Sequence, residues 1–138
     1  MAAFVYTRAV RFDEIDAAGL VYFPKVVALA HEGLERMLAE GMPGGYAALV
    51  VGRRIGLPCV HFEADFKAPL RFGDDVRVTV TVGELGSSSV KLDVVVARTD
   101  GVHCAQLFYV TACAALDGPK KLPLPDDLRA VLERYRAT

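Results

Sequence analysis

Residues 24–40 read PKVVALAHEGLERMLAE, and the architecture follows from this stretch. Pro24 is typical of the first turn of a helix. Apolar or small residues then recur every third or fourth position, which predicts a helix from Pro24 to Glu40 with one apolar face: Val26, Leu29, Ala30, Gly33, Leu34, Met37 and Leu38. A glycine inside a helix costs up to about 1 kcal/mol relative to alanine. We therefore interpret Gly33 as a point of close approach to another backbone.

The remaining chain is mostly strand-like. Apolar residues alternate with polar ones in residues 4–12, which predicts a half-buried strand that includes Phe12. Further strands are predicted at residues 60–67, 76–82, 90–98 and 102–116, separated by Gly- and Asp-rich turns, and a short amphipathic helix at residues 126–136. Residues 46–56 carry no clear pattern.

These elements predict an α+β fold. Successive strands with short turns pair antiparallel, and a helix with one apolar face packs on the resulting sheet. We therefore expect a single curved antiparallel sheet wrapped around one long central helix. The chain has 138 residues, the size of one domain, so residues 1–138 are expected to form a single domain.

Composition excludes several classes of protein. The chain is 53% hydrophobic and 24% charged, which is typical of a globular core rather than a disordered segment. Sixteen basic and 17 acidic residues leave a net charge of −1, so we expect no nucleic acid or membrane partner. The three cysteines form no CxxC pair, and the first eight residues resemble no signal peptide. No apolar run reaches membrane-spanning length. A cytoplasmic location is expected.

Residues 16–24, DAAGLVYFP, place a carboxylate and small residues directly before the helix. Free N–H groups at a helix start can stabilise a developing oxyanion. A nearby carboxylate can act as a nucleophile or as a general base toward water. From the residues alone, Asp16 could equally cap a turn, with Gly19 supplying a positive φ, because Asp and Gly are common in loops.

Two motifs resemble those of the 4-hydroxybenzoyl-CoA thioesterase-like hotdog family: RFDEIDAAGLVYF at residues 11–23 and FKAPLRFGD at residues 66–74. The resemblance covers nearly the whole chain. It implies hydrolysis of an acyl-CoA thioester, with Asp16 as nucleophile or general base and the backbone amide of Phe23 binding the carbonyl oxygen. It implies no metal and no cofactor, since CoA is part of the substrate. It also implies a homodimer or homotetramer with active sites at the subunit interface.

The chain departs from this family at one notable position. Fifteen residues after Asp16, where the family usually carries an acid, stands His31. With LPCVH at residues 57–61 and KKLPLP at residues 120–125, this resembles the branch that hydrolyses 1,4-dihydroxy-2-naphthoyl-CoA. The resemblance favours an aromatic or cyclic acyl group. A short-chain or fatty acyl-CoA thioesterase and a non-catalytic acyl-CoA-binding protein are the alternatives.

Several other residues are candidates for the site. The motif before the helix implies substrate contacts from Gly19, Val21 and Tyr22. His31 either bonds Glu35 one helical turn away or orients water. His61 shares a strand face with Glu63 and Asp65 and lies either on a polar outer sheet face or on a pocket wall. Near the turn between the strands predicted at residues 76–82 and 90–98, the candidates for contact with CoA are Ser87, Ser88, Ser89 and Lys91.

Overall fold

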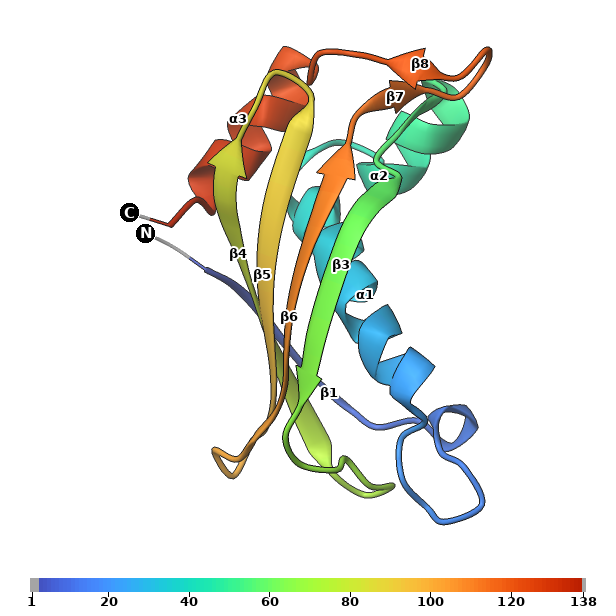
Figure 1. The fold of residues 1–138 in the computed structure, drawn as a ribbon, viewed down its shortest axis with the longest axis vertical. Coiled ribbons are helices and arrows are strands. Elements are labelled where there is room, and N and C mark those ends of the chain that lie inside the picture. The colour runs from blue at the N-terminus through green and yellow to red at the C-terminus, as the bar shows by residue number, and fades with distance from the viewer. Residues whose placement is uncertain (1–2, 138) are drawn as a thin grey trace.

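The structure, a computed structural model, describes residues 3–137 (Figure 1). Residues 1, 2 and 138 lie outside the described residues. All three belong to the expected domain, and residues 1 and 2 also belong to the eight residues compared with signal peptides. A five-stranded antiparallel sheet in the order β1-β4-β5-β6-β3 carries the long helix α1 (Phe23–Gly41) on one face. Its strands are β1 (Phe4–Ala9), β3 (Cys59–Phe66), β4 (Asp75–Leu85), β5 (Ser89–Arg98) and β6 (His103–Ala112). The predicted α+β architecture is confirmed.

Short elements close the two ends of this sheet. They are a 3-10 turn, η1 (Phe12–Glu14), a small helix, α2 (Gly45–Ala47), a π-helical turn, η2 (Ala48–Gly52), and the C-terminal helix α3 (Asp126–Arg134). A second sheet joins β2 (Ile55–Gly56), β7 (Ala114–Ala115) and β8 (Lys120–Lys121). Within residues 3–137, none of the helices combines the length and apolar character needed to span a membrane.

The central helix lies directly against the sheet, as the glycine at position 33 of its apolar face led us to predict. A Cβ added at Gly33 would lie 2.6 Å from Cγ2 of Val80 on β4, so only a glycine allows the observed approach. On the same face, the hydroxyl of Tyr6 donates to the carbonyl of Leu29 at 2.8 Å. All seven residues of the predicted apolar helix face are buried. The helix begins at Phe23, one residue before the predicted start.

The predicted strand at residues 4–12 is too long. β1 ends at Ala9, and Phe12 lies in η1 with 74% of its surface exposed. The reason is a local turn, in which the carboxylate of Glu14 accepts the N–H of Arg11 at 2.8 Å and draws the chain away from the sheet. The ring of Phe12 packs edge-on against Phe72, with centroids 5.7 Å apart.

Two further predictions are wrong, one about the pairing of a strand and one about the extent of another. β3 does not pair with β4, the next long strand, but with β6 at the other edge of the sheet. Residues 67–74 connect them and contain Pro69, which has no N–H for a hairpin ladder. The predicted strand at 102–116 is interrupted at Cys113, whose N–H donates to the carbonyl of Ser88, and the chain then enters the small sheet as β7.

The contact at Gly33 generates a stability prediction. Gly33→Val should lower the free energy of unfolding by about 1–3 kcal/mol, because the new side chain must displace Val80. Gly52→Val is the matched control, since an added Cβ there meets no atom within 4 Å, and should change stability by less than about 0.5 kcal/mol. Urea unfolding measures both. Equal midpoints for the two variants would contradict this packing.

Candidate active site

The loop that holds Asp16 is closed by its own hydrogen bonds. One carboxylate oxygen of Asp16, Oδ1, accepts the N–H groups of Ala18 at 2.9 Å and Leu20 at 3.2 Å. Gly19 has a φ of +80°. Asp16 therefore caps a turn and Gly19 supplies a positive φ, as the residue types alone suggested. The other carboxylate oxygen accepts no hydrogen bond from residues 3–137, and the side chain is exposed, so one oxygen stays free for chemistry.

The same loop is docked on the second sequence motif. The N–H of Val21 donates to the carbonyl of Leu70 at 2.8 Å, and the N–H of Phe72 donates to the carbonyl of Gly19 at 3.2 Å. Residues 16–21 thus lie beside residues 70–72, although about 50 positions separate them in the chain. The two motifs that carry the family resemblance form one structural unit.

The start of α1 presents one free amide. The N–H groups of Lys25 and Val26 both donate to the carbonyl of Tyr22, at 2.7 and 3.3 Å. Pro24 has no N–H. Across the described part of the chain, the N–H of Phe23 donates no hydrogen bond, and it lies where the helix dipole is positive. This amide is placed to bind a carbonyl oxygen.

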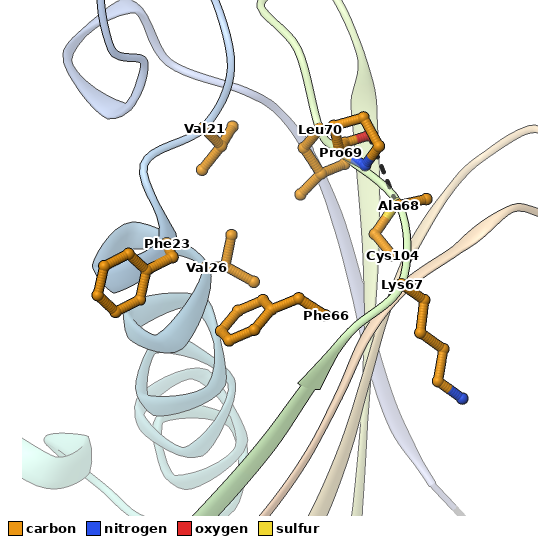
Figure 2. A pocket seen from close by; sticks show the side chains of 9 residues that line it. All are labelled: Val21, Phe23, Val26, Phe66, Lys67, Ala68, Pro69, Leu70 and Cys104. Carbon is orange, nitrogen blue, oxygen red and sulfur yellow. Dashed lines mark hydrogen bonds between the residues drawn. The ribbon is translucent and has the colours of Figure 1, made fainter.

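An apolar cleft of about 320 Å³ opens beside this amide (Figure 2). Its walls include Val21, Phe23 and Val26 on one side and Phe66 and Leu70 on the other. The rings of Phe23 and Phe66 meet edge to face at 6.2 Å. Figure 2 shows the Lys67 side chain turned away from these rings, and the lining of the cleft is mostly apolar. Tyr22, half exposed, packs against Phe23 at 5.4 Å.

A network of charges fixes the Asp16 loop to β1 and α1. The guanidinium of Arg8 binds Glu14, two residues before Asp16, at 2.6 and 2.9 Å. It also binds Glu32 on α1, with a shortest distance of 2.9 Å. Arg36 completes the network with a 3.0 Å bond to Glu32, one helical turn away. Three separate chain segments are held together at one arginine.

These contacts shift the acidity of both carboxyls. The hydrogen bonds from Arg8 hold the pKa of Glu14 below its ordinary value. Burial by itself would raise the pKa of Glu32, but the hydrogen bonds and charge of Arg8 outweigh burial and leave that pKa lowered. Both side chains are therefore carboxylates at neutral pH. Sequence reasoning identified Glu14 as part of the motif but missed Arg8, because nothing in a strand pattern reveals the partner of a charged residue.

The two histidine candidates lie away from Asp16. Nε2 of His31 lies 3.2 Å from a carboxylate oxygen of Glu35, the local pairing that was one of its two interpretations. Along the helix, His31 is about 12 Å from Phe23. Nε2 of His61 lies 2.7 Å from a carboxylate oxygen of Glu63. His61 is on the sheet face opposite α1, because its neighbour Phe62 pairs with the buried Tyr109 on the inner face.

The serine-rich turn lies at the far end of the molecule. Figure 1 places the loop before α1 and the turn between β4 and β5 at opposite ends of the sheet. Ser87, Ser88 and Ser89 border a cavity of about 370 Å³ together with Lys121. Lys91 is not part of this cavity and pairs with Glu84 at 3.2 Å. Because β5 alone spans roughly 30 Å, one subunit does not bring these residues to Asp16.

Comparison with known proteins identifies the family. A sequence profile of the Thioesterase-like superfamily matches residues 10–132. The chain belongs to the thioesterase-like superfamily. Its relatives include a 1,4-dihydroxy-2-naphthoyl-CoA hydrolase from Synechocystis, 32% identical over 128 residues and 91% of each chain. The expected thioester hydrolase family and hotdog fold are confirmed.

Solved structures of thioesterases agree with this assignment. A 1,4-dihydroxy-2-naphthoyl-CoA thioesterase from Synechocystis superposes with a TM-score of 0.85 at 27% identity, covering 95% of this chain and 96% of the other. A gentisyl-coenzyme A thioesterase superposes with a TM-score of 0.79 at 29% identity, covering 91% of this chain and 98% of the other. Within residues 3–137 of this thioesterase-like chain, no group of three or more His, Cys, Asp or Glu side chains could hold a metal ion.

The Arg8 network generates a pH-dependent prediction. Arg8→Gln should lower the free energy of unfolding at pH 7 by about 3 kcal/mol, because it leaves the largely buried carboxylate of Glu14 without a cation and that of Glu32 with Arg36 alone. The difference in free energy of unfolding between the wild type and Arg8→Gln is fully present above the ordinary glutamate pKa of about 4.3. It is lost as the pH falls through the lowered pKa values of Glu14 and Glu32. Urea unfolding at several pH values measures the difference.

A matched control separates this network from an ordinary surface pair. Arg53 binds Asp127 at 2.7 Å, but both side chains are about half exposed. Arg53→Gln should therefore cost much less stability than Arg8→Gln, because solvent screens this pair. If Arg8→Gln costs no more than Arg53→Gln at pH 7, or if its cost is the same at low pH, the network does not fix the loop as described.

Proposed function

We propose that this protein hydrolyses an aromatic or cyclic acyl-CoA of the 1,4-dihydroxy-2-naphthoyl or hydroxybenzoyl type to the free acid and CoA. The observation that carries the proposal is the pairing of a free helix-start amide, at Phe23, with a carboxylate on the loop that leads into it, at Asp16. The apolar cleft bordered by Phe23 supports an acyl group at the same place. The names of the relatives support the aromatic class.

The chemistry follows from these two groups. The thioester carbonyl oxygen accepts the N–H of Phe23, and the developing oxyanion is stabilised by this bond and by the helix dipole. If Asp16 acts as nucleophile, its carboxylate oxygen attacks the carbonyl carbon, the CoA thiolate leaves, and water hydrolyses the mixed anhydride. If Asp16 acts as general base, it takes a proton from the attacking water, and the thiolate leaves from the tetrahedral intermediate.

Two other substrates or roles remain alternatives on this scaffold. A short-chain or fatty acyl thioesterase would use the same two groups, and a non-catalytic protein would bind acyl-CoA without turnover. A panel of acyl-CoA thioesters with detection of free thiol separates the three. In our proposal the hydrolysis needs no resident cofactor, because CoA enters and leaves with the substrate. The free thiols Cys59, Cys104 and Cys113 support a reducing, cytoplasmic location.

We further propose that the active enzyme is a homodimer or a dimer of dimers. β3 is an edge strand with exposed apolar side chains, including Val60 at 63% and Phe66 at 51%. An open apolar edge of this kind favours pairing with another strand, and a twofold axis closes such a pair. Antiparallel pairing of two β3 strands would carry the serine-rich turn of one subunit toward the Asp16 end of the other. Ser88, Ser89 and Lys121 would then be available to CoA.

Substitution at Asp16 tests the chemistry. Asp16→Asn keeps the shape of the side chain and removes its basic oxygen, so turnover of the best thioester should fall by about 10²–10⁴-fold. Asp13→Asn is the control, since Asp13 is an exposed acid on the preceding turn and should keep turnover close to that of the wild type. A folded Asp16→Asn protein with most of its turnover would favour the binding role.

Substitution at the sheet edge tests the assembly. Val60→Asp places like charges near each other across the proposed twofold axis, so light scattering should shift toward the monomer and turnover should fall. Val51→Asp is the matched control, because Val51 is at least as exposed but lies in η2. A wild-type protein that is monomeric at micromolar concentration and fully active would refute the dimer.

A further inference from the structure

A second cavity lies along the middle of α1. It has a volume of about 400 Å³, and its walls include His31, Tyr46, Leu57, Tyr109 and Thr111. A smaller hollow of about 120 Å³ is lined by Val27, Ala30 and Phe62, and it shares His31, Cys59 and Tyr109 with the larger cavity. The two hollows therefore adjoin each other between α1 and the β3–β6 edge of the sheet.

Two buried hydroxyls border this cavity without a partner. Tyr109 is 5% exposed and Thr111 is 1% exposed, yet within the described residues neither hydroxyl makes a hydrogen bond. Buried polar groups in proteins are nearly always hydrogen-bonded, and an unpaired one needs an explanation. Burial raises the pKa of Tyr109, so its hydroxyl keeps its proton and can donate.

Two other tyrosine hydroxyls of this protein are hydrogen-bonded. The hydroxyl of the buried Tyr6 donates to the carbonyl of Leu29 at 2.8 Å, and the hydroxyl of the partly buried Tyr46 accepts the N–H of Leu57 at 3.1 Å. Tyr46 lines the same cavity as Tyr109 and Thr111, so the cavity wall does not by itself leave a hydroxyl without a partner. Tyr109 and Thr111 belong to the same strand, β6, two positions apart, so both point to the face that carries α1.

The hollows lie beyond the proposed reaction centre along the helix axis. Val27 is about 6 Å from Phe23 along this axis, and His31 is about 12 Å from it. A planar acyl group whose carbonyl binds the Phe23 amide would therefore meet the apolar Val27 and Ala30 first. Its far end would meet the hydroxyl-bearing wall formed by Tyr109 and Thr111.

We infer that the hydroxyls of Tyr109 and Thr111 form a polar subsite that selects acyl groups with a ring hydroxyl at the end remote from the carbonyl. This inference rests on the proposed function, because it places the far end of the acyl group in the second cavity. A ring hydroxyl can both donate and accept, and so can each of the two side chains. A saturated acyl chain or an unsubstituted ring leaves both buried hydroxyls unpaired, and the site discriminates against it.

The test compares two thioesters that differ only in a ring hydroxyl at the end remote from the carbonyl, 6-hydroxy-2-naphthoyl-CoA and 2-naphthoyl-CoA. The measured quantity is the ratio of their kcat/KM values. Tyr109→Phe and Thr111→Val each remove one hydroxyl and conserve the rest of the shape. Each should lower the ratio by about 10- to 100-fold. Both variants should unfold at or above the wild-type urea midpoint, since neither hydroxyl has a protein partner to lose.

Tyr6→Phe is the matched control, because it removes a hydroxyl that does have a partner. It should lower the urea midpoint and leave the ratio of the two kcat/KM values at the wild-type value. A wild-type ratio in both Tyr109→Phe and Thr111→Val would overturn the inference. So would a loss of stability in these variants equal to that of Tyr6→Phe, since it would show that the hydroxyls serve the fold.

A binding measurement separates failure of this inference from failure of the proposed function. Absence of turnover with every thioester would contradict the proposed function alone. Calorimetric binding of 6-hydroxy-2-naphthoate and 2-naphthoate to wild-type and Tyr109→Phe protein still tests the subsite in that case. A preference for the hydroxylated acid that is reduced in the variant supports the subsite, and equal affinities of the wild type for both acids contradict it.

Discussion

The close approach of α1 to β4 at Gly33 is the constraint on which the site depends. The backbone of the helix lies so near the sheet that a single added carbon would overlap Val80. This contact fixes the helix axis relative to the sheet. The free amide of Phe23 at one end of the helix and the second cavity along its middle take their positions from the same axis. In our proposal, one packing contact therefore positions both the reacting group and the selective subsite.

The Arg8 network adds the second fixed point. Without it, only backbone hydrogen bonds would hold the loop that contains Asp16, one from the N–H of Tyr22 at the start of α1 to the carbonyl of Glu14 and others to residues 70–72. With it, the residue two positions before Asp16 is bound to β1 and, through Arg8, to α1. A charged network costs desolvation energy and is repaid only by good geometry. In the proposed mechanism, its benefit is placement of the Asp16 carboxylate, which must stay within reach of the thioester carbonyl carbon.

Local patterns in the sequence predicted the local structure. Helical spacing located α1 to within one residue, and alternation located the long strands. Long-range pairing was not predictable in this way, since β3 joins β6 rather than its neighbour in the chain. Asp16 could not be told from an ordinary turn residue by its type, and the structure shows that it is also a turn residue; only its motif distinguished it. The buried hydroxyls of Tyr109 and Thr111 escaped notice because their lack of a partner is a property of packing.

A crystal structure of the protein with a non-hydrolysable aromatic acyl-CoA thioether ketone analogue tests the central claim most directly. The account predicts that the ketone oxygen accepts the N–H of Phe23 at about 2.7–3.1 Å. It predicts that the free carboxylate oxygen of Asp16 faces the ketone carbon, directly or through one water. A ketone bound away from the Phe23 amide, with Asp16 contacting neither the carbonyl carbon nor a water beside it, would contradict the account.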